Sequence, residues 1–274
     1  MIANTLPLLT WRWLKVNDAL IELPEVKDQV SEIVAKEGEK VETLFDINST
    51  DNVSRHTKIK ITAEKNSEVN IYYVSRCSNE ENALTDITAD IKEGAVVNLI
   101  QVESGAKNSV TNYVANLLEK SASTNVESVY FSNNDNNLDV FYHINHIGEE
   151  TKSNIIVNGA LKDKARKTFK GTIDFKKGSV RSVGSEEEFA TLLDDTVRAI
   201  AIPVLLCQED DVEGVHAASA GKIDQDKLFY IMSRGLDYDQ AKKMLVETRL
   251  VPTIQKLPDE ELAKEVWSQI ESRI

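Results

Sequence analysis

The most regular feature of the chain is a recurring order of polar and apolar positions that begins near residue 38. A polar turn is followed each time by an apolar residue that opens an extended run, and apolar and polar positions often alternate within the run, as in "TKIKIT" at 57–62. The unit recurs as "EGEKVETL", "KNSEVNIYY", "EGAVVNLI", "ASTNVESVYF", "TKSNIIVNG" and "KGSVRSV", at Val41, Val69, Val97, Val126, Ile155 and Val180. The steps between these positions are 28, 28, 29, 29 and 25 residues.

A nearly constant step of this size is typical of stacked repeats. Each unit has room for two strands and two turns, and one unit cannot bury its apolar face alone. The pattern therefore predicts a mainly β protein built as a parallel β-helix. An antiparallel sandwich with evenly spaced hairpins stays open as an alternative, although the hairpin signals Asn-Gly and Asp-Gly occur only once, at Asn158-Gly159.

The chain divides into three regions. We expect a lead-in over residues 1–30, the β-helix over 31–221 and a C-terminal helical domain over 222–274. Within the β-helix, 186–218 is ambiguous, because "EEEFATLLDDTVRAIAI" has the spacing of a helix and "PVLLCQ" that of a strand, with Pro203 between them.

The tail carries clear helix signals. Asp224 is expected to cap a helix that ends at Gly235, and Asp237 a second helix with Gln240 in the capping-box position. Pro258 is expected in the first turn of a third helix. The expected apolar faces are Ala241, Met244 and Leu245 in the second helix, and Leu262, Val266 and Ile270 in the third.

Composition narrows the class of protein. A net charge of −13 argues against nonspecific binding to nucleic-acid phosphates. Two cysteines make neither a disulfide framework nor a zinc-site spacing. The first residues lack the pattern of a signal peptide, and no window of about 18 apolar residues occurs. We expect a soluble cytoplasmic protein that binds neither nucleic acid nor membrane.

Few residues suggest chemistry. Nucleotide-binding and common hydrolase motifs are absent from the sequence. The acidic residues Asp210, Asp211 and Glu213 allow a β-helix polysaccharide enzyme with paired carboxylates, or simply a solvated turn. His56 is expected at the surface, and His143 and His146 as separate packing histidines, since they fall on opposite faces of a strand.

His216 and Cys207 are the remaining candidates for a ligand role. His216 precedes the small-residue run "AASAG", which allows close approach of another backbone, whereas a lone histidine can also be purely structural. Cys207 lies in the run "VLLCQ" and is expected to pack as a small hydrophobic residue, with a weaker claim to a ligand role.

Three longer segments carry a resemblance to a known family. The segment 203–241 contains "DDV", His216, "LFYIMSRG" at 228–235 and Ala241, and "INHIGEETKSN" with "GALKDKARKTFKGTIDF" spans 144–175. Together with "LPLLTWRWLKVN" at 6–17, they resemble the SufB/SufD family, the scaffold proteins of the SUF iron–sulfur cluster assembly system. The chain is most similar to SufD and lacks the longer N-terminal helical region of many members, so we expect a reduced SufD-like subunit.

The resemblance implies an architecture and partners. It implies a right-handed parallel β-helix with a C-terminal helical domain that docks a SufC-type ATPase. It also implies pairing with SufB through the β-helix end, or with a second copy as a SufB-like homodimer. Such a scaffold has no catalysis of its own and no stably bound cofactor, and iron or a nascent cluster is handled transiently at the interface of the complex.

The resemblance also assigns site residues. His216 falls at the histidine that SufD-type proteins place at the scaffold interface, and Cys207 lies near it in sequence. Position 214, where SufD proteins often carry cysteine, is Gly214, and the residue after the histidine, glutamate in SufB proteins, is Ala217. The expected ATPase-docking residues are Phe229, Tyr230, Ser233, Arg234, Gly235 and Tyr238. Of the pairs 229/233 and 230/234, which each share a helix face, one is expected to pack inward.

Overall fold

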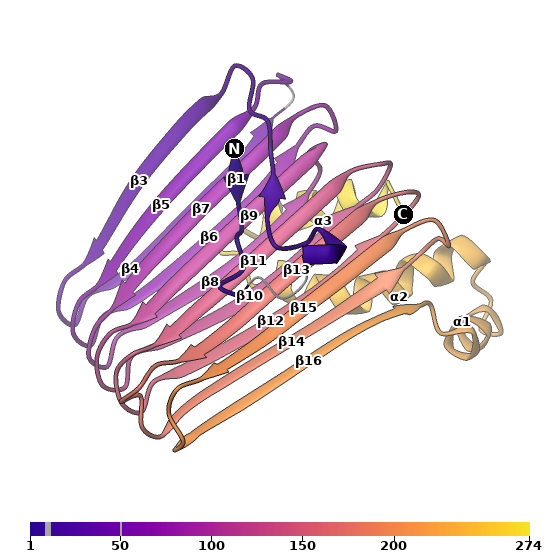
Figure 1. Cartoon of the computed structure of the whole chain (residues 1–274). Helices are drawn as coiled ribbons and strands as arrows, with labels where there is room; N and C mark the ends of the chain where they lie inside the picture. Colours follow the sequence, from indigo (N-terminus) through magenta and orange to yellow (C-terminus); the bar gives the residue numbers. More distant parts are fainter. Residues whose placement is uncertain (9–11, 50) are drawn as a thin grey trace.

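Two parallel β-sheets of seven strands each face one another in the computed structural model, which describes residues 1–8, 12–49 and 51–274 (Figure 1). The odd sheet contains β3 (Lys27–Ala35), β5 (Arg55–Ala63), β7 (Asn82–Ile91), β9 (Asn108–Leu117), β11 (Asn137–His146), β13 (Arg166–Phe175) and β15 (Arg198–Cys207). The even sheet contains β4 (Lys40–Ser49), β6 (Glu68–Cys77), β8 (Val96–Ser104), β10 (Ser123–Ser132), β12 (Lys152–Leu161), β14 (Ser182–Leu192) and β16 (Val212–Lys222).

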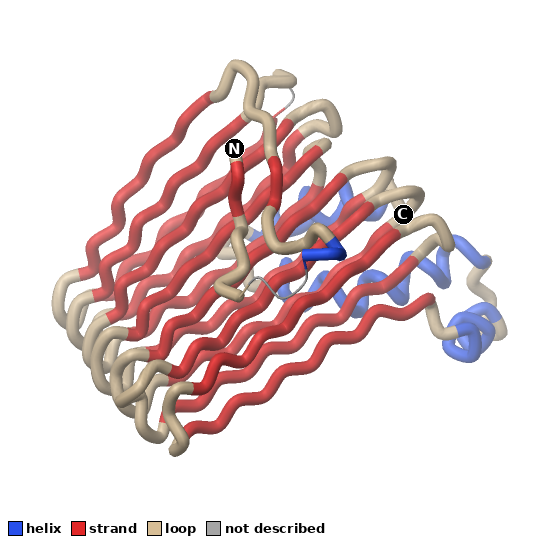
Figure 2. The backbone as a smooth tube through the Cα atoms, viewed as in Figure 1, coloured by secondary structure: helices blue, strands red, loops and turns tan. Residues whose placement is uncertain are grey.

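The chain alternates between the two sheets, so that each odd strand and the even strand after it form one layer of a solenoid (Figure 2). All pairs within both sheets are parallel. This is the parallel β-helix that the repeat predicts, and the antiparallel sandwich is wrong.

The register follows the repeat through most of its length. The predicted neighbours Val41 and Val69, Val69 and Val97, and Val126 and Ile155 pair directly. Val126 pairs on its other side with Leu99, two residues beyond the expected Val97. Because side chains alternate with a period of two, this slip leaves the same face buried.

The last predicted step is wrong. Val180 lies in a turn, and the residue that pairs with Ile155 is Glu186 on β14. The helix considered for 186–201 is also absent, because β14 and the start of β15 occupy this segment. Pro203 lies inside β15, the edge strand of its sheet, where a missing backbone N–H costs little.

One turn position explains why the repeat is visible in the sequence. Six successive layers place a residue of positive φ at the same corner, namely Gly38, Asn66, Gly94, Ser121, Glu150 and Arg181. In the first four, its amide donates to a carbonyl of the next layer at 2.8–3.0 Å, as from Gly38 to Lys65. Glycine and asparagine adopt this left-handed conformation most readily, which favours the polar, small-residue turns.

Different segments cover the outer faces of the two sheets. The helices α2 (Tyr238–Ile254) and α3 (Glu260–Glu271) pack on the even sheet, where Leu250 and Val266 join Val102 and Phe131 in one cluster. The lead-in, with β1 (Ile2–Ala3), η1 (Arg12–Leu14) and β2 (Ala19–Leu20), crosses the odd sheet (Figure 1). Helix α1 (Gln225–Met232) lies beyond the carboxyl end of β16 (Figure 1).

The helix ends agree with the sequence in most respects. Asp224 caps α1, Gly235 has φ +100°, and Asp237 forms a capping box with Gln240. Pro258, expected in the first turn of α3, instead precedes the N-cap Asp259.

The apolar face predicted for α3 is confirmed, whereas the one predicted for α2 is mostly wrong. Leu262, Val266 and Ile270 are buried as expected. On α2 the expected face is wrong beyond Ala241: Met244 is exposed and Leu245 half-buried, and the buried side chains include Val246 and Leu250.

Candidate assembly interface

The terminal layer, β15 and β16, is the open end of the solenoid. Within the described residues no further strand stacks on β16, so its backbone edge is unpaired. Almost every side chain of β16 is exposed, including Val215 at 60%. A long, exposed edge strand is a template for pairing with another chain, and natural proteins usually block or cover one.

His216 lies at the centre of this strand and faces the interior side of the open end. It pairs in register with Glu186 on β14, and in-register residues of neighbouring parallel strands point to the same face. Glu186 is buried inside the solenoid, whereas His216 is exposed because no layer covers it.

Cys207 and Gly214 lie at one corner of the terminal layer. Cys207 pairs in register with Phe175, and the Phe175 ring is 3.1 Å from the position that a Cβ on Gly214 would occupy. Cys207 is a free, exposed thiol, so the expectation that it packs as a small hydrophobic residue is wrong. Among the described residues, no three His, Cys, Asp or Glu side chains form a ready-made metal site.

Glu186, directly beneath the terminal layer, is a site residue that the sequence did not predict. Its side chain is fully buried, and neither carboxylate oxygen has a hydrogen-bond partner among the described residues. Burial, and then the charge of Glu188, raise the pKa of Glu186 to about 8. The run "SEEEF" contains the relevant pattern, because in a strand its alternation places Glu186 and Glu188 on one interior face.

Glu188, in contrast, has two partners on its Oε1 atom. Its carboxylate forms a buried ion pair with Lys167 and accepts a hydrogen bond from the Tyr130 hydroxyl at 3.1 Å. Burial raises the pKa of Glu188 and lowers that of Lys167, and each charge opposes the shift of the other. The layer beneath the open end therefore holds one carboxyl group with polar partners and one without a partner among the described residues.

The other histidines have local roles. His146 is buried and its ring nitrogens lie 2.7 Å from Thr151 Oγ1 and 2.8 Å from Ser153 Oγ, as expected for a packing histidine. Burial lowers the pKa of His143. His56 was expected at the surface, but it lies on β5, is buried, and contacts Asp86 at 2.8 Å.

The three acidic residues considered for glycan chemistry do not form a buried pair. Asp211 lies in the turn between β15 and β16 beside Asp210, and Glu213 is exposed on β16. Their surroundings are those of a solvated turn.

Helix α1 and the residues after it form a second exposed surface. Only Leu228 of α1 is buried, while Phe229 is 73% and Tyr230 is 58% exposed. The other exposed members of this surface, which we call the aromatic surface, are Met232, Ser233, Arg234, Gly235, Tyr238 and Met244. Contrary to expectation, neither the 229/233 pair nor the 230/234 pair packs inward.

Arg234 orders part of the aromatic surface. Its guanidinium donates to the Tyr230 hydroxyl at 2.9 Å and lies 5.0 Å from the centre of the same ring. Aromatic residues, methionine and arginine are enriched at protein interfaces. Such residues are exposed on α1, on the turn after it and on the first part of α2, a combination typical of a docking surface.

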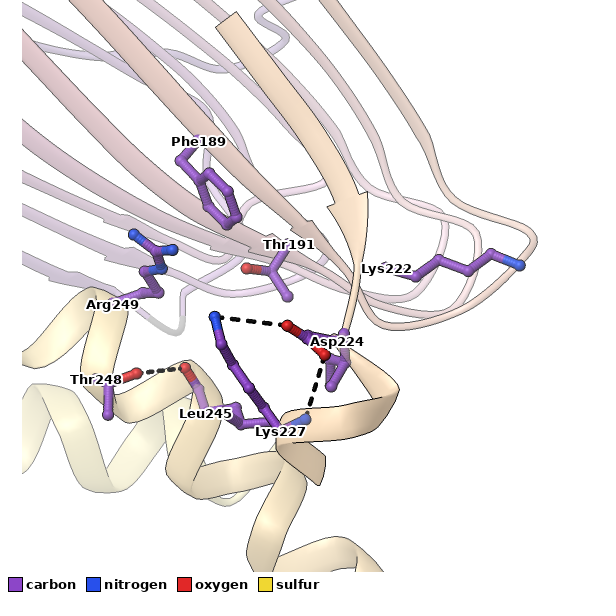
Figure 3. Close-up of a pocket in the computed structure, with 9 residues that line it drawn as sticks. Phe189, Thr191, Lys222, Asp224, Lys227, Leu245, Thr248 and Arg249 are labelled. Carbon is purple, nitrogen blue, oxygen red and sulfur yellow. Dashed lines mark hydrogen bonds and ion pairs between the residues drawn. The ribbon is translucent and has the colours of Figure 1, made fainter. Parts of the chain in front are cut away.

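A pocket of about 450 Å³ lies between the helices α1 and α2 and the even sheet (Figure 3). The Arg249 guanidinium lies 4.0 Å from the centre of the Phe189 ring, and Lys227 Nζ lies 3.5 Å from Asp224, the N-cap of α1. The first contact joins α2 to the even sheet, and the second joins α1 to its own N-cap.

Comparisons with known proteins identify the family. The family model described as "SUF system FeS cluster assembly, SufBD core domain" matches residues 26–249, which include both sheets, α1 and most of α2. The chain belongs to the SufBD family of iron–sulfur cluster assembly proteins. The resemblance seen in the sequence is therefore confirmed.

Individual relatives support the same assignment. The SufD protein of Bacillus subtilis is 33% identical over 129 residues, 47% of this chain and 30% of the relative. The SufD protein of Escherichia coli is 28% identical over 114 residues, 42% of this chain and 27% of the relative. A SufBD family protein of Mycobacterium tuberculosis is 28% identical over 225 residues, 81% of this chain and 25% of the relative. The chain thus spans less than a third of the length of each.

No helix in the described part of the chain is long and apolar enough to cross a membrane.

Proposed function

We propose that this SufBD family protein is a SufD-like scaffold subunit in the cytoplasm that pairs through its terminal layer and docks a SufC-type ATPase through its aromatic surface. The observation that carries the proposal is the open terminal layer, an exposed parallel strand with an unpaired edge. Pairing with a SufB-type scaffold completes this end of the solenoid. A second copy of the chain is the alternative partner.

The terminal layer offers side chains suited to iron. An imidazole at His216 and a free thiol at Cys207 are both ligand types that bind iron and clusters. Iron or a nascent cluster is cargo here, held between two chains and passed on, so this chain needs no resident cofactor and performs no catalysis of its own.

The aromatic surface supports the ATPase contact. Interface energy concentrates in a few exposed aromatic and arginine side chains, and Phe229, Tyr230 and Arg234 are of these types. They lie on α1 and directly after it, and α1 follows Asp224 and β16, so motion of a docked ATPase can reach the terminal layer through this connection.

The experiment is a binding titration with a SufC-type ATPase. Phe229→Ala and Arg234→Glu are each expected to weaken binding by about tenfold or more, as for interface hot spots. The matched control is Lys264→Glu, an equal charge change on the exposed face of α3. Unchanged affinity in both surface variants would refute docking through this surface.

A further inference from the structure

The most unusual group in the interior is the carboxylate of Glu186. Buried tyrosines elsewhere inside the solenoid have partners: Tyr113 Oη contacts Thr124 Oγ1 at 2.7 Å, and Tyr142 Oη donates to Gln101 Oε1 at 2.9 Å. Glu186 is the only described side chain with two buried oxygens that both lack a partner. An unpaired buried carboxyl group costs stability, so its position needs a reason.

The fold makes room for this carboxylate. Glu186 reaches across the interior from β14 to Gly171 on β13, where a Cβ would lie 2.1 Å from either oxygen. Gly171 pairs with Pro203 and Glu186 pairs with His216, both in the terminal layer. The carboxylate therefore occupies a cradle left by a glycine, one layer below the exposed imidazole.

We propose that Glu186 and His216 together form the protein side of a cation site for a divalent first-row metal ion, entered from the open end of the solenoid. A carboxylate and an imidazole are ligands that suit Fe²⁺. Adjacent strands lie about 4.8 Å apart, so an ion between the two layers can contact both side chains. Water or groups of a partner chain take the remaining positions.

The surrounding charges favour a cation. Glu188 and Lys167 form an ion pair in the same layer, so ionised Glu186 adds one net negative charge to the interior. A bound cation offsets that charge and gives the two orphaned oxygens a partner. The inference rests on the proposed function only for the choice of iron as the natural ion.

The experiment uses Co²⁺ as a spectroscopic substitute for Fe²⁺, titrated into the single purified chain. Absorbance gives the affinity, and paramagnetic shifts of backbone amides give the position. In the wild type the largest shifts are expected at Gly171, which lies against the Glu186 carboxylate, and at the amides next to Glu186 and His216 on β14 and β16. Glu186→Gln and His216→Ala are each expected to weaken Co²⁺ binding by about tenfold or more, as loss of a ligand does.

Glu187→Gln is the matched control. Residue 187 lies on the same strand but on its exposed face, so this variant removes the same charge and is expected to bind Co²⁺ like the wild type. Circular dichroism checks folding, and Glu186→Met serves as a second variant if the glutamine variant does not fold. Absent Co²⁺ binding in the wild type, or an affinity of a folded Glu186 variant within twofold of it, overturns the proposal.

The same variants separate this site from the proposed function. Glu186→Gln is expected to bind the ATPase normally, because the aromatic surface is unchanged. A chain that binds Co²⁺ through Glu186 but ignores the ATPase would retain the cation site and refute the docking.

Discussion

The middle of the solenoid and its terminal layer are built from the same kind of parallel strand but differ in how completely their polar side chains find partners. In the middle, Ile71, Ile144 and Ile155 are fully buried, and His146 has a partner on each ring nitrogen. At the end, His216 and Cys207 are exposed, and Glu186 is buried without a partner. Stability is concentrated in the middle, and the groups available for binding are concentrated at the end.

Removal of apolar volume tests this difference most strongly. Ile155→Ala is expected to lower the free energy of unfolding by about 2–5 kcal/mol, because it leaves a cavity among closely packed neighbours. Val215→Ala, on the exposed terminal strand, is expected to change it by less than about 0.5 kcal/mol. Urea denaturation followed by circular dichroism measures both, and equal losses would contradict the comparison.

The pH dependence of stability tests the buried His146 in the middle of the solenoid. Burial lowers the pKa of His146 to about 4 from the ordinary 6.5, so the folded state disfavours its protonation. Its contribution to stability is complete above pH 6.5 and falls as the pH drops toward 4, by at most about 3 kcal/mol. His146→Gln should remove this part of the pH dependence. Parallel stability curves for the two proteins between pH 4 and 6.5 would rule the effect out.

The space around two glycines distinguishes the closed interior of the solenoid from its open end. A Cβ on Gly159 would lie 2.0 Å from the Tyr130 ring, whereas one on Gly221 would meet nothing within 4 Å. Gly159→Ala is expected to cost about 1–3 kcal/mol through overpacking. Gly221→Ala should be close to neutral in the same denaturation experiment, and a comparable loss there would show that the end is more tightly packed than described.

The smallest expected effect has the opposite sign. Glu186→Met replaces an unpartnered carboxyl group with an adaptable apolar side chain and should raise the free energy of unfolding by about 1 kcal/mol in the absence of metal. Glu187→Met, on the exposed face, is expected to be neutral. Destabilisation by Glu186→Met would indicate that the carboxylate is satisfied in the free protein.

The sequence predicted the regular part of this molecule better than its end. The turn residues and apolar positions from Val41 to Ile155 specify the layers, because every layer repeats the same local solution. The prediction failed where the layers turn polar: Glu186 and Glu188 occupy interior positions that the pattern reserves for apolar residues, so β14 resembled a helix. Exposure of Cys207, Met244 and both faces of α1 depends on what packs against them, which local sequence does not record.

The most direct test of the account is the mass of the complex that forms through the terminal layer. Light scattering on this chain co-expressed with a SufB-type scaffold should give a heterodimer. Ala218→Lys, which puts a charge on the interior-facing side of β16, should give separate monomers, since inward-pointing charges prevent edge pairing. Ala217→Lys, on the opposite face of the same strand, should still pair. A wild-type chain that stays monomeric both alone and together with the partner would contradict the assembly interface proposed for the terminal layer.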